Sequence, residues 1–166
     1  MTDFSHIDDQ GRVRMVDVTD KAVTVREAVA EGRVTMRPAT LEQILDRSVK
    51  KGNVLETARI AGVMGAKKTA ELIPMCHPLN LTHVAVDFFP DAAAGVLLIR
   101  ATARIADRTG VEMEALTAVA LAALTVYDMC KSMDRDMTIS HMALVKKTGG
   151  KSGTFERAGS IDAPHP

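Results

Sequence analysis

The longest apolar run in the chain predicts a buried helix. Between residues 115 and 127 only two threonines interrupt the apolar positions. A helix that is apolar nearly all round belongs inside a fold or between subunits. Thr109 is followed three residues later by Glu112, which is the pattern of a capping box, so we expect this helix to cover residues 111 to 134.

Alternating apolar and polar positions predict strands before and after this helix. The expected strands cover residues 13–18, 22–36, 82–88, 97–105 and 137–146. Pro90 and Gly95 mark a turn between the third and fourth strands, so these two should form a hairpin. The prediction of a strand at 22–36 depends on its β-branched residues, because the middle of this segment would also suit a helix.

Two further helices are expected between the second and third strands. Thr40 and Asn53 are each followed three residues later by Gln or Glu, which repeats the capping-box spacing. The second helix contains Gly62 and Gly65. Each glycine costs about 1 kcal/mol relative to alanine inside a helix, which suggests that the helix backbone lies close to another element.

These elements predict an α+β fold of the ferredoxin-like type. Apart from the short strand at 13–18, their order is strand, helices, strand, strand, helix, strand. This is the βαββαβ pattern of an antiparallel sheet with helices on one face. The open face of the sheet and the apolar helix both need covering, so we expect oligomerisation. One domain should cover residues 1–153, with residues 1–12 as a loose arm and 154–166 as a flexible tail.

Composition and charge exclude several classes of function. The chain has 166 residues, and its 21 acidic and 21 basic side chains cancel, so nothing global favours nucleic acid or an anionic membrane. No Trp, one Tyr and four Phe are too few for a base-stacking surface. Two cysteines make no disulfide framework and no signal peptide opens the chain, so we expect a cytoplasmic protein. The thirteen-residue apolar run is shorter than the roughly 20 residues that span a bilayer.

Asp128 and Lys131 lie three residues apart at the end of the long helix, so they are neighbours on its surface. A solvated ion pair worth a few tenths of a kcal/mol is one interpretation. The surrounding Met129, Cys130 and Met133 favour another, in which partial burial shifts both pKa values and creates an acid–base pair. The sequence leaves both interpretations open.

Lysines occur in three groups along the chain, and each group alone is typical of a solvated surface. The groups are Lys50 and Lys51, Lys67 and Lys68, and Lys146, Lys147 and Lys151. Together with Arg100 and Arg104, which share one face of a strand, they could converge on a polyphosphate. The segment 149–153 resembles a P-loop, but Val145 replaces the first glycine and no helix follows. We therefore expect only a loop that offers amides and a lysine to phosphate.

Cys76 and His77 lie between two prolines and have the side-chain types of metal ligands. No Cys-x-x-Cys or His-x-x-x-His partner accompanies them, and His83 is expected in a strand, so we expect no zinc site. Adjacent Cys and His residues are also awkward as a nucleophilic pair. His77 is better suited to positioning a ligand or transferring a proton.

Glu114 and Asp128 lie on nearly the same face of the long helix but at opposite ends. Fourteen residues separate them, which is about 21 Å at 1.5 Å per residue. Unless the ligand is long, one compact site cannot hold both residues from one chain. We therefore predict a site shared between subunits.

Five segments, in this order, form a specific pattern. They are KGNVLETARIAG at 51–62, LIPMCHPL at 72–79, GVEMEALT at 110–117, YDMCK at 127–131 and KTGGKSG at 147–153. Together they resemble the cyclic pyranopterin monophosphate synthase family, MoaC, and the likeness extends over residues 15–153. Asn53 stands where aspartate is common in that family, and Glu56 where alanine is common.

The resemblance implies a ferredoxin-like subunit in a homohexamer, a trimer of dimers with active sites at subunit interfaces. It implies a lyase of molybdenum cofactor biosynthesis. The substrate would be 3′,8-cyclo-7,8-dihydro-GTP, made by a radical-SAM GTP cyclase, and the products cyclic pyranopterin monophosphate and pyrophosphate. By matching position, Asp128, Lys131 and Lys51 would be catalytic. The substrate would be bound by Met75, Cys76, His77, Glu112, Met113 and Glu114, and the lysine groups add Lys67, Lys147 and Lys151 as further candidates. No metal or other cofactor is implied, although Mg²⁺ could accompany a triphosphate.

Two other classes of function remain as alternatives. A non-catalytic module could bind a purine nucleotide through the lysine groups, and its binding would tolerate Asp128→Asn. A structural oligomerisation protein would use the long helix only as an interface, and a guanine nucleotide would not raise its melting temperature.

Overall fold

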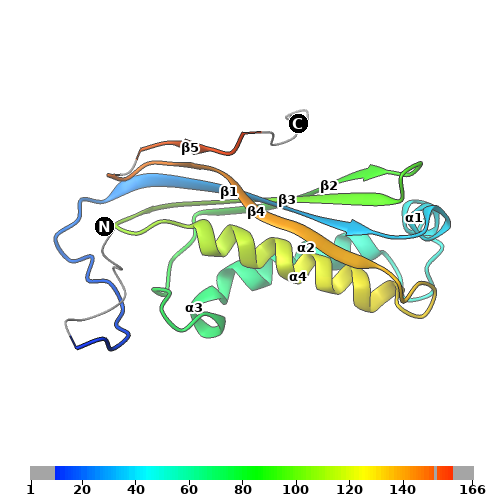
Figure 1. The fold of residues 1–166 in the computed structure, drawn as a ribbon, viewed down its shortest axis with the longest axis horizontal. Helices are drawn as coiled ribbons and strands as arrows, with labels where there is room; N and C mark the ends of the chain where they lie inside the picture. Colours follow the sequence, from blue (N-terminus) through cyan, green and yellow to red (C-terminus); the bar gives the residue numbers. More distant parts are fainter. Residues whose placement is uncertain (1–9, 152, 159–166) are drawn as a thin grey trace.

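Five antiparallel strands form one open sheet in the order β2-β3-β1-β4-β5 (Figure 1). The computed structural model describes residues 10–151 and 153–158. Along the chain the elements are β1 (Thr24–Thr35), α1 (Pro38–Leu45), α2 (Val54–Lys67), α3 (Thr69–Leu72), β2 (His83–Asp91), β3 (Val96–Asp107), α4 (Glu112–Cys130), β4 (Thr138–Thr148) and β5 (Phe155–Glu156).

The order of the first four strands confirms the ferredoxin-like fold. β1 and β3 lie in the middle of the sheet and pair along their whole length, from Thr24 opposite Asp107 to Thr35 opposite Val96. β2 and β4 flank them, and α2 and α4 cover one face of the sheet (Figure 1). This is the predicted βαββαβ arrangement, in which both connecting helices lie on the same face.

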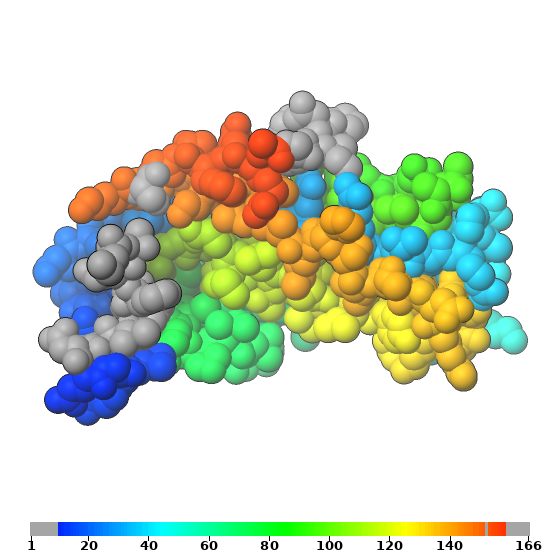
Figure 2. Space-filling model, in the orientation of Figure 1, coloured from blue at the N-terminus to red at the C-terminus, as the bar shows by residue number. Residues whose placement is uncertain are grey.

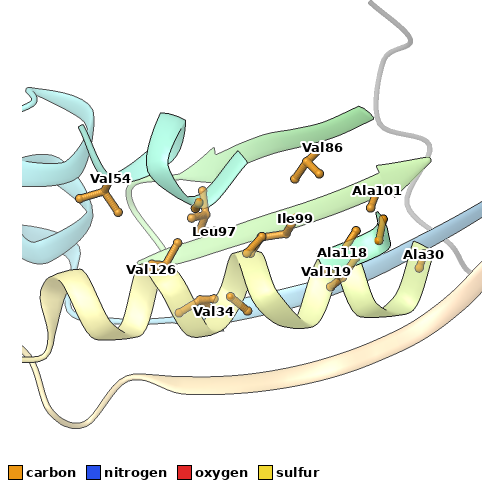
Figure 3. Close-up of a cluster of buried hydrophobic side chains, with 14 of the residues drawn as sticks. Ala30, Val34, Val54, Val86, Leu97, Ile99, Ala101, Ala118, Val119 and Val126 are labelled. Atoms are coloured by element: carbon orange, nitrogen blue, oxygen red, sulfur yellow. The ribbon is translucent and has the colours of Figure 1, made fainter. Parts of the chain in front are cut away.

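The core lies between this face of the sheet and α4. Alternate residues of β3 point toward the helices and are buried: Leu97, Ile99, Ala101, Ala103 and Ile105. They belong to the same core cluster as Ala118, Val119 and Val126 of α4 (Figure 3). Gly32 of β1 faces the same helix, since an added Cβ would lie 2.6 Å from Val119 Cγ1. Small residues therefore let α4 lie close to the sheet.

Two glycines bring α2 and α4 together, as their position in the sequence suggested. An added Cβ at Gly62 would lie 2.9 Å from the carbonyl oxygen of Ala118, and one at Gly65 would lie 2.9 Å from Leu121 Cγ. A side chain at Gly62 would have to displace the backbone of α4, and one at Gly65 would have to displace Leu121. The helix propensity lost at these positions, about 1 kcal/mol each, is offset by this close packing.

The long helix begins within one residue of the predicted start, but its predicted cap and its predicted end are wrong. α4 begins at Glu112 after Val111, without a side-chain cap, so the capping box predicted from Thr109 is not formed. The Glu112 carboxylate instead accepts a hydrogen bond from Lys147. The helix ends at Cys130, not at residue 134, because the chain turns there and the amides of residues 133 and 134 both donate to the Cys130 carbonyl.

The other two predicted caps differ in outcome. Thr40 lies inside α1, which already begins at Pro38, and its hydroxyl donates to Asp134, so the predicted cap is wrong. Asn53 caps α2 as predicted, because its Oδ1 accepts from the Glu56 amide at 3.2 Å.

Near the N-terminus one predicted strand is not formed, and near the C-terminus the structure contains a strand that was not predicted. Of the strand predicted at 13–18, only an isolated bridge at Val13 is formed. Residues 1–9 of the predicted arm lie outside the described residues. In the predicted tail, β5 pairs with β4, with Phe155 opposite Lys147 and Glu156 opposite Lys146. The flexibility of the remaining tail stays a prediction.

Within the described residues, α4 alone is long and apolar enough to cross a bilayer by length and composition. More than half of its most apolar window, 56%, is buried inside the domain. Its packing against α2 and the sheet identifies it as the core helix that the apolar run predicted.

Candidate active site

Helix α4 carries predicted site residues at both ends, and the two groups lie far apart. In Figure 1 its first turn lies near α3 and its last turn at the other end of the molecule. Figure 2 shows the same separation, with the segment after α3 (green) left of centre and the end of α4 (yellow) toward the right. The spacing of about 21 Å between Glu114 and Asp128 follows from helix geometry.

A cleft of about 290 Å³ opens beside the first turn of α4. Three segments line it: the chain before β1, the loop after α3 and the start of α4. Six predicted site residues meet here: Met75, Cys76, His77, Glu112, Met113 and Glu114. The loop brings its residues here because Pro74 and Pro78 keep the chain from forming a longer helix after α3.

Glu114 is the most deeply buried acid in this cleft, with 3% of its surface exposed. Burial raises its pKa to about 7, and the neighbouring Glu112 carboxylate adds to the rise. A carboxyl group with this pKa exchanges protons readily near neutrality. It is therefore suited to general acid–base catalysis.

Cys76 lies in the same cleft but remains a thiol at neutral pH. Burial raises its pKa above the ordinary 9.0, and the charge of Glu114 adds to that effect. Thiolate is the nucleophilic form of cysteine, so this environment does not activate Cys76 as a nucleophile. The expectation that Cys76 and His77 contact a ligand instead stays a prediction.

A second cleft of about 160 Å³ adjoins the first and is rich in basic residues. The two clefts share Lys21, Thr109, Gly110 and Glu112. The second adds three further cations: Arg26, Arg108 and Lys147. Against the two carboxylates of Glu27 and Glu112, four cations leave this cleft net positive, which favours an anion such as a polyphosphate.

Several contacts hold the loop between β3 and α4 in place beneath these clefts. Arg26 of β1 donates from Nε to the Asp107 carbonyl at 3.0 Å and from Nη2 to the Arg108 carbonyl at 2.9 Å. Lys147 Nζ donates to Glu112 Oε1 at 2.9 Å, which joins β4 to the start of α4. The Glu112 carboxylate lies where a side chain on Gly110 would be, so a larger residue there would have to displace it.

At the other end of α4, Lys51, Asp128 and Lys131 form one cluster, as their predicted common role requires. Lys131 Nζ lies 2.6 Å from Asp128 Oδ1. Lys51 Nζ donates to the Asp128 carbonyl at 2.7 Å and lies 3.4 Å from Asp128 Oδ2. Two lysines from different elements therefore bracket one carboxylate.

Of the two interpretations that the sequence left open for Asp128 and Lys131, the single chain shows the solvated ion pair. The Asp128 side chain is 61% exposed and the Lys131 side chain 52%. The hydrogen bond and charge of Lys131, with the charge of Lys51, lower the pKa of Asp128, and the hydrogen bond to Asp128 raises the pKa of Lys131. Both values move away from neutrality, because ion pairing dominates where burial is slight.

The remaining basic residues do not converge as predicted. Lys67 is exposed in the last turn of α2 and lines neither cleft. Lys151 is exposed in the turn after β4, two residues from Gly149, which does line the second cleft. Arg100 and Arg104 do share one face of β3, but they pair there with glutamates of β1 and line neither cleft.

No group of three or more His, Cys, Asp or Glu side chains within residues 10–151 and 153–158 is placed to hold a metal ion. The prediction of a reaction without a resident metal stays a prediction.

The sequence matches the family model of the MoaC family over residues 15–150. The chain belongs to the MoaC family. It is 69% identical over 155 residues to a cyclic pyranopterin monophosphate synthase of Desulforapulum autotrophicum, covering 93% of this chain and 95% of that protein. A protein of the same name from Desulfatibacillum aliphaticivorans is 64% identical, covering 96% and 100%. One from Chloroflexus aggregans is 58% identical, covering 93% of each chain.

The family match includes both clefts and the Lys51–Asp128–Lys131 cluster, whereas Lys151 lies one residue beyond it. Three basic residues that line the second cleft of this MoaC chain were not predicted from the sequence as site residues: Lys21, Arg26 and Arg108. Each is isolated from the lysine groups in the sequence. The one available signal was that Arg108 precedes the Thr-Gly pair that leads into the long helix.

Proposed function

We propose that this chain is a cyclic pyranopterin monophosphate synthase, a lyase of molybdenum cofactor biosynthesis. It converts 3′,8-cyclo-7,8-dihydro-GTP to cyclic pyranopterin monophosphate and releases pyrophosphate. The observation that carries the proposal is the 69% identity to a synthase of that name over 93% of this chain. The two groups of polar residues on α4 both lie within that similarity.

The two adjoining clefts at the start of α4 suit the two parts of this reaction. Ring opening and reclosure need proton donors and acceptors, and Glu114, with a pKa of about 7, can act as either near neutrality. The departing pyrophosphate needs cations, which Lys21, Arg26, Arg108 and Lys147 supply in the second cleft.

At the other end of α4, Lys131 acts as general acid, Asp128 positions it, and Lys51 contacts phosphate or a ring oxygen. The three side chains are already in contact in the single chain. Because all three are about half exposed, they have room for a ligand or for a second subunit to cover them.

The active site is proposed to lie between subunits of a homohexamer, a trimer of dimers. The cleft of one subunit would face the Lys51–Asp128–Lys131 cluster of another. The two groups could then act on one substrate although about 21 Å separates Glu114 from Asp128 along α4 of a single chain. Exposed apolar side chains on α2 and α4, namely Ile60, Met64 and Leu124, support association, because each is more than half exposed in the single chain.

The substrate is a small purine derivative, and the enzyme that supplies it is proposed to be a radical-SAM GTP cyclase. The reaction takes place in the cytoplasm and involves neither nucleic acid nor membrane. It needs no resident cofactor, and Mg²⁺ enters only as a companion of the substrate's triphosphate.

Turnover of the cyclised substrate tests the proposal. Purified protein is given 3′,8-cyclo-7,8-dihydro-GTP, and the pyranopterin product and pyrophosphate are measured beside Lys131→Ala and Asp128→Ala. We expect product from the wild type and a large loss in both variants. A folded oligomer that binds the substrate without turning it over would instead be a nucleotide-binding module.

A further inference from the structure

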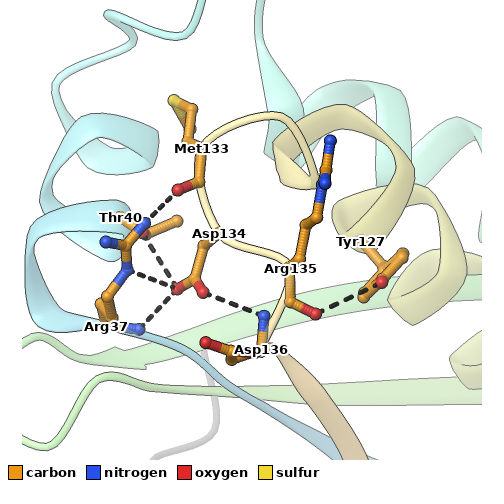
Figure 4. Close-up of polar contacts among 7 residues, drawn as sticks. All are labelled: Arg37, Thr40, Tyr127, Met133, Asp134, Arg135 and Asp136. Atoms are coloured by element: carbon orange, nitrogen blue, oxygen red, sulfur yellow. Dashed lines mark hydrogen bonds and ion pairs between the residues drawn. The ribbon is translucent and has the colours of Figure 1, made fainter.

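Asp134 is a charged residue that the proposed reaction does not use, yet it is almost completely buried. It lies in the turn after α4, and 2% of its surface is exposed. Figure 4 shows its carboxylate at the centre of a set of hydrogen bonds. A buried carboxylate is costly unless donors surround it, so these contacts define what Asp134 does.

The contacts of Asp134 come from two separate parts of the chain. Oδ2 accepts from the Arg37 amide at 2.8 Å and from the Thr40 hydroxyl at 3.1 Å, and the Arg37 guanidinium Nε lies 3.4 Å away. Oδ1 accepts from the Asp136 amide at 3.3 Å. The Arg37 guanidinium also donates to the Met133 carbonyl (Figure 4). These bonds, with the amide of Arg37 first among them, lower the pKa of Asp134, so it is ionised at neutral pH.

This carboxylate therefore joins the start of α1 to the end of α4. Arg37 is the residue before α1 and has no side-chain cap of its own there. The chain leaves α1 at Leu45 and reaches Lys51 six residues later. On the other side of the junction, Lys131 lies three residues before Asp134. Both halves of the Lys51–Asp128–Lys131 cluster are thus anchored through the same buried group.

The core holds the backbone beside the cluster, since Val49, Val54 and Met129 are buried, whereas the three side chains of the cluster lie outside the core. These side chains are about half exposed and lie on two segments that are far apart in the sequence. A lysine that must deliver a proton or contact a phosphate works only when it is held in the right place, and a shift of 1 Å can cost about a hundredfold in rate. A rigid junction behind the cluster supplies that placement.

We propose that Asp134 is a positioning residue, whose buried carboxylate holds the end of α4 against the start of α1 and so sets Lys51 against Asp128 and Lys131. It does not touch the substrate. The inference rests on the proposed function, because only turnover reports on the placement of the cluster.

The test is Asp134→Asn, compared with Glu31→Gln. Asparagine keeps the shape, but its NH₂ group cannot accept a hydrogen bond, so one side of the junction loses its acceptor. Glu31 is the matched control because it too is a buried carboxylate, 7% exposed, paired with Arg100 at 2.7 Å. It lies on β1 between residues that face α4, so its own side chain points to the far side of the sheet.

Three quantities are measured for each protein: the melting temperature, kcat and KM for the cyclised substrate. We expect both variants to melt at lower temperature. Asp134→Asn should also lose about tenfold or more in kcat, at a temperature where it is fully folded, with a smaller change in KM. Glu31→Gln should keep the wild-type kcat.

The proposal is overturned if folded Asp134→Asn keeps the wild-type kcat, or if Glu31→Gln loses as much kcat as Asp134→Asn. If Asp134→Asn does not fold, Thr40→Val removes one hydrogen bond to the same oxygen. A wild-type kcat in that variant overturns the proposal, whereas a reduced kcat supports it. A wild-type protein without turnover would refute the proposed function instead, and the two failures are therefore distinguishable.

Discussion

Single acids at the two ends of α4 differ in burial, and burial decides how each titrates. Glu114 is 3% exposed and has a pKa of about 7, whereas Lys131 and Lys51 lower the pKa of the exposed Asp128. Of these two acids in the single chain, Glu114 is therefore the one that exchanges its proton near neutral pH. The sequence identified both residues. Their titration was beyond it, because a pKa depends on neighbours that other elements supply.

Glu114→Gln should change how stability depends on pH. The folded-state pKa of about 7 lies above the ordinary 4.5, so the folded protein holds this proton while the unfolded chain releases it. Glu114 therefore makes its full contribution to the free energy of unfolding below pH 4.5, and this contribution is lost as pH rises toward 7. Urea unfolding across this range should show that the variant gains stability relative to the wild type as pH rises. A difference independent of pH would contradict the buried, protonated Glu114.

At the scale of helices and strands, the sequence predicted elements well and their ends less well. Alternation located β2 and β3, and the apolar run located α4. The start of α1 was missed because its partner, Asp134, lies 97 residues after Arg37. The cap of α4 was wrong because Lys147 binds the carboxylate that would complete it. Local spacing cannot reveal partners that arrive from distant segments.

Asn53 and Thr109, which both lie at predicted helix starts, offer a matched test of this difference. Asn53→Ala removes a cap that is formed, so it should lower the unfolding free energy by about 1 kcal/mol. Thr109→Ala removes a cap that is not formed and should cost at most a few tenths. Both are measured by guanidinium unfolding at one protein concentration, since subunit association shifts apparent stability. Equal losses would mean that Thr109 stabilises the start of α4 after all.

At the scale of the whole molecule, α4 separates the two groups of residues that the proposed site would combine. The cleft beside Glu114 and the cleft next to it hold the near-neutral acid and four cations, and the cluster at Asp128 holds Lys51 and Lys131. The sequence predicted this separation, because helix length follows directly from residue count. It did not predict that Lys21, Arg26 and Arg108 gather in one cleft, because they come from different segments that only the folded sheet brings together.

Mixing inactive variants should restore activity if the halves meet between subunits. His77→Ala damages the cleft and Lys131→Ala damages the cluster, so each should be inactive alone. Oligomers refolded from an equal mixture should regain about a quarter of the wild-type activity, because one site in four then draws both intact halves. Mixing Asp128→Ala with Lys131→Ala, which damage the same half, should restore nothing. The idea fails if the first mixture is as inactive as the second.

The short strand β5 has a consequence for how the protein behaves in storage. Without Phe155–Glu156 and the Arg157 amide, which donates to the Val145 carbonyl at 2.8 Å, the outer edge of β4 would offer unpaired backbone groups. Such an edge is a template for strands of other molecules, and it leads to aggregation. At the opposite edge, β2 ends in Pro90 and Asp91, which discourage the same process. Proteolytic clipping between Gly149 and Gly153 would therefore shorten the shelf life of the protein even where its active site is left whole.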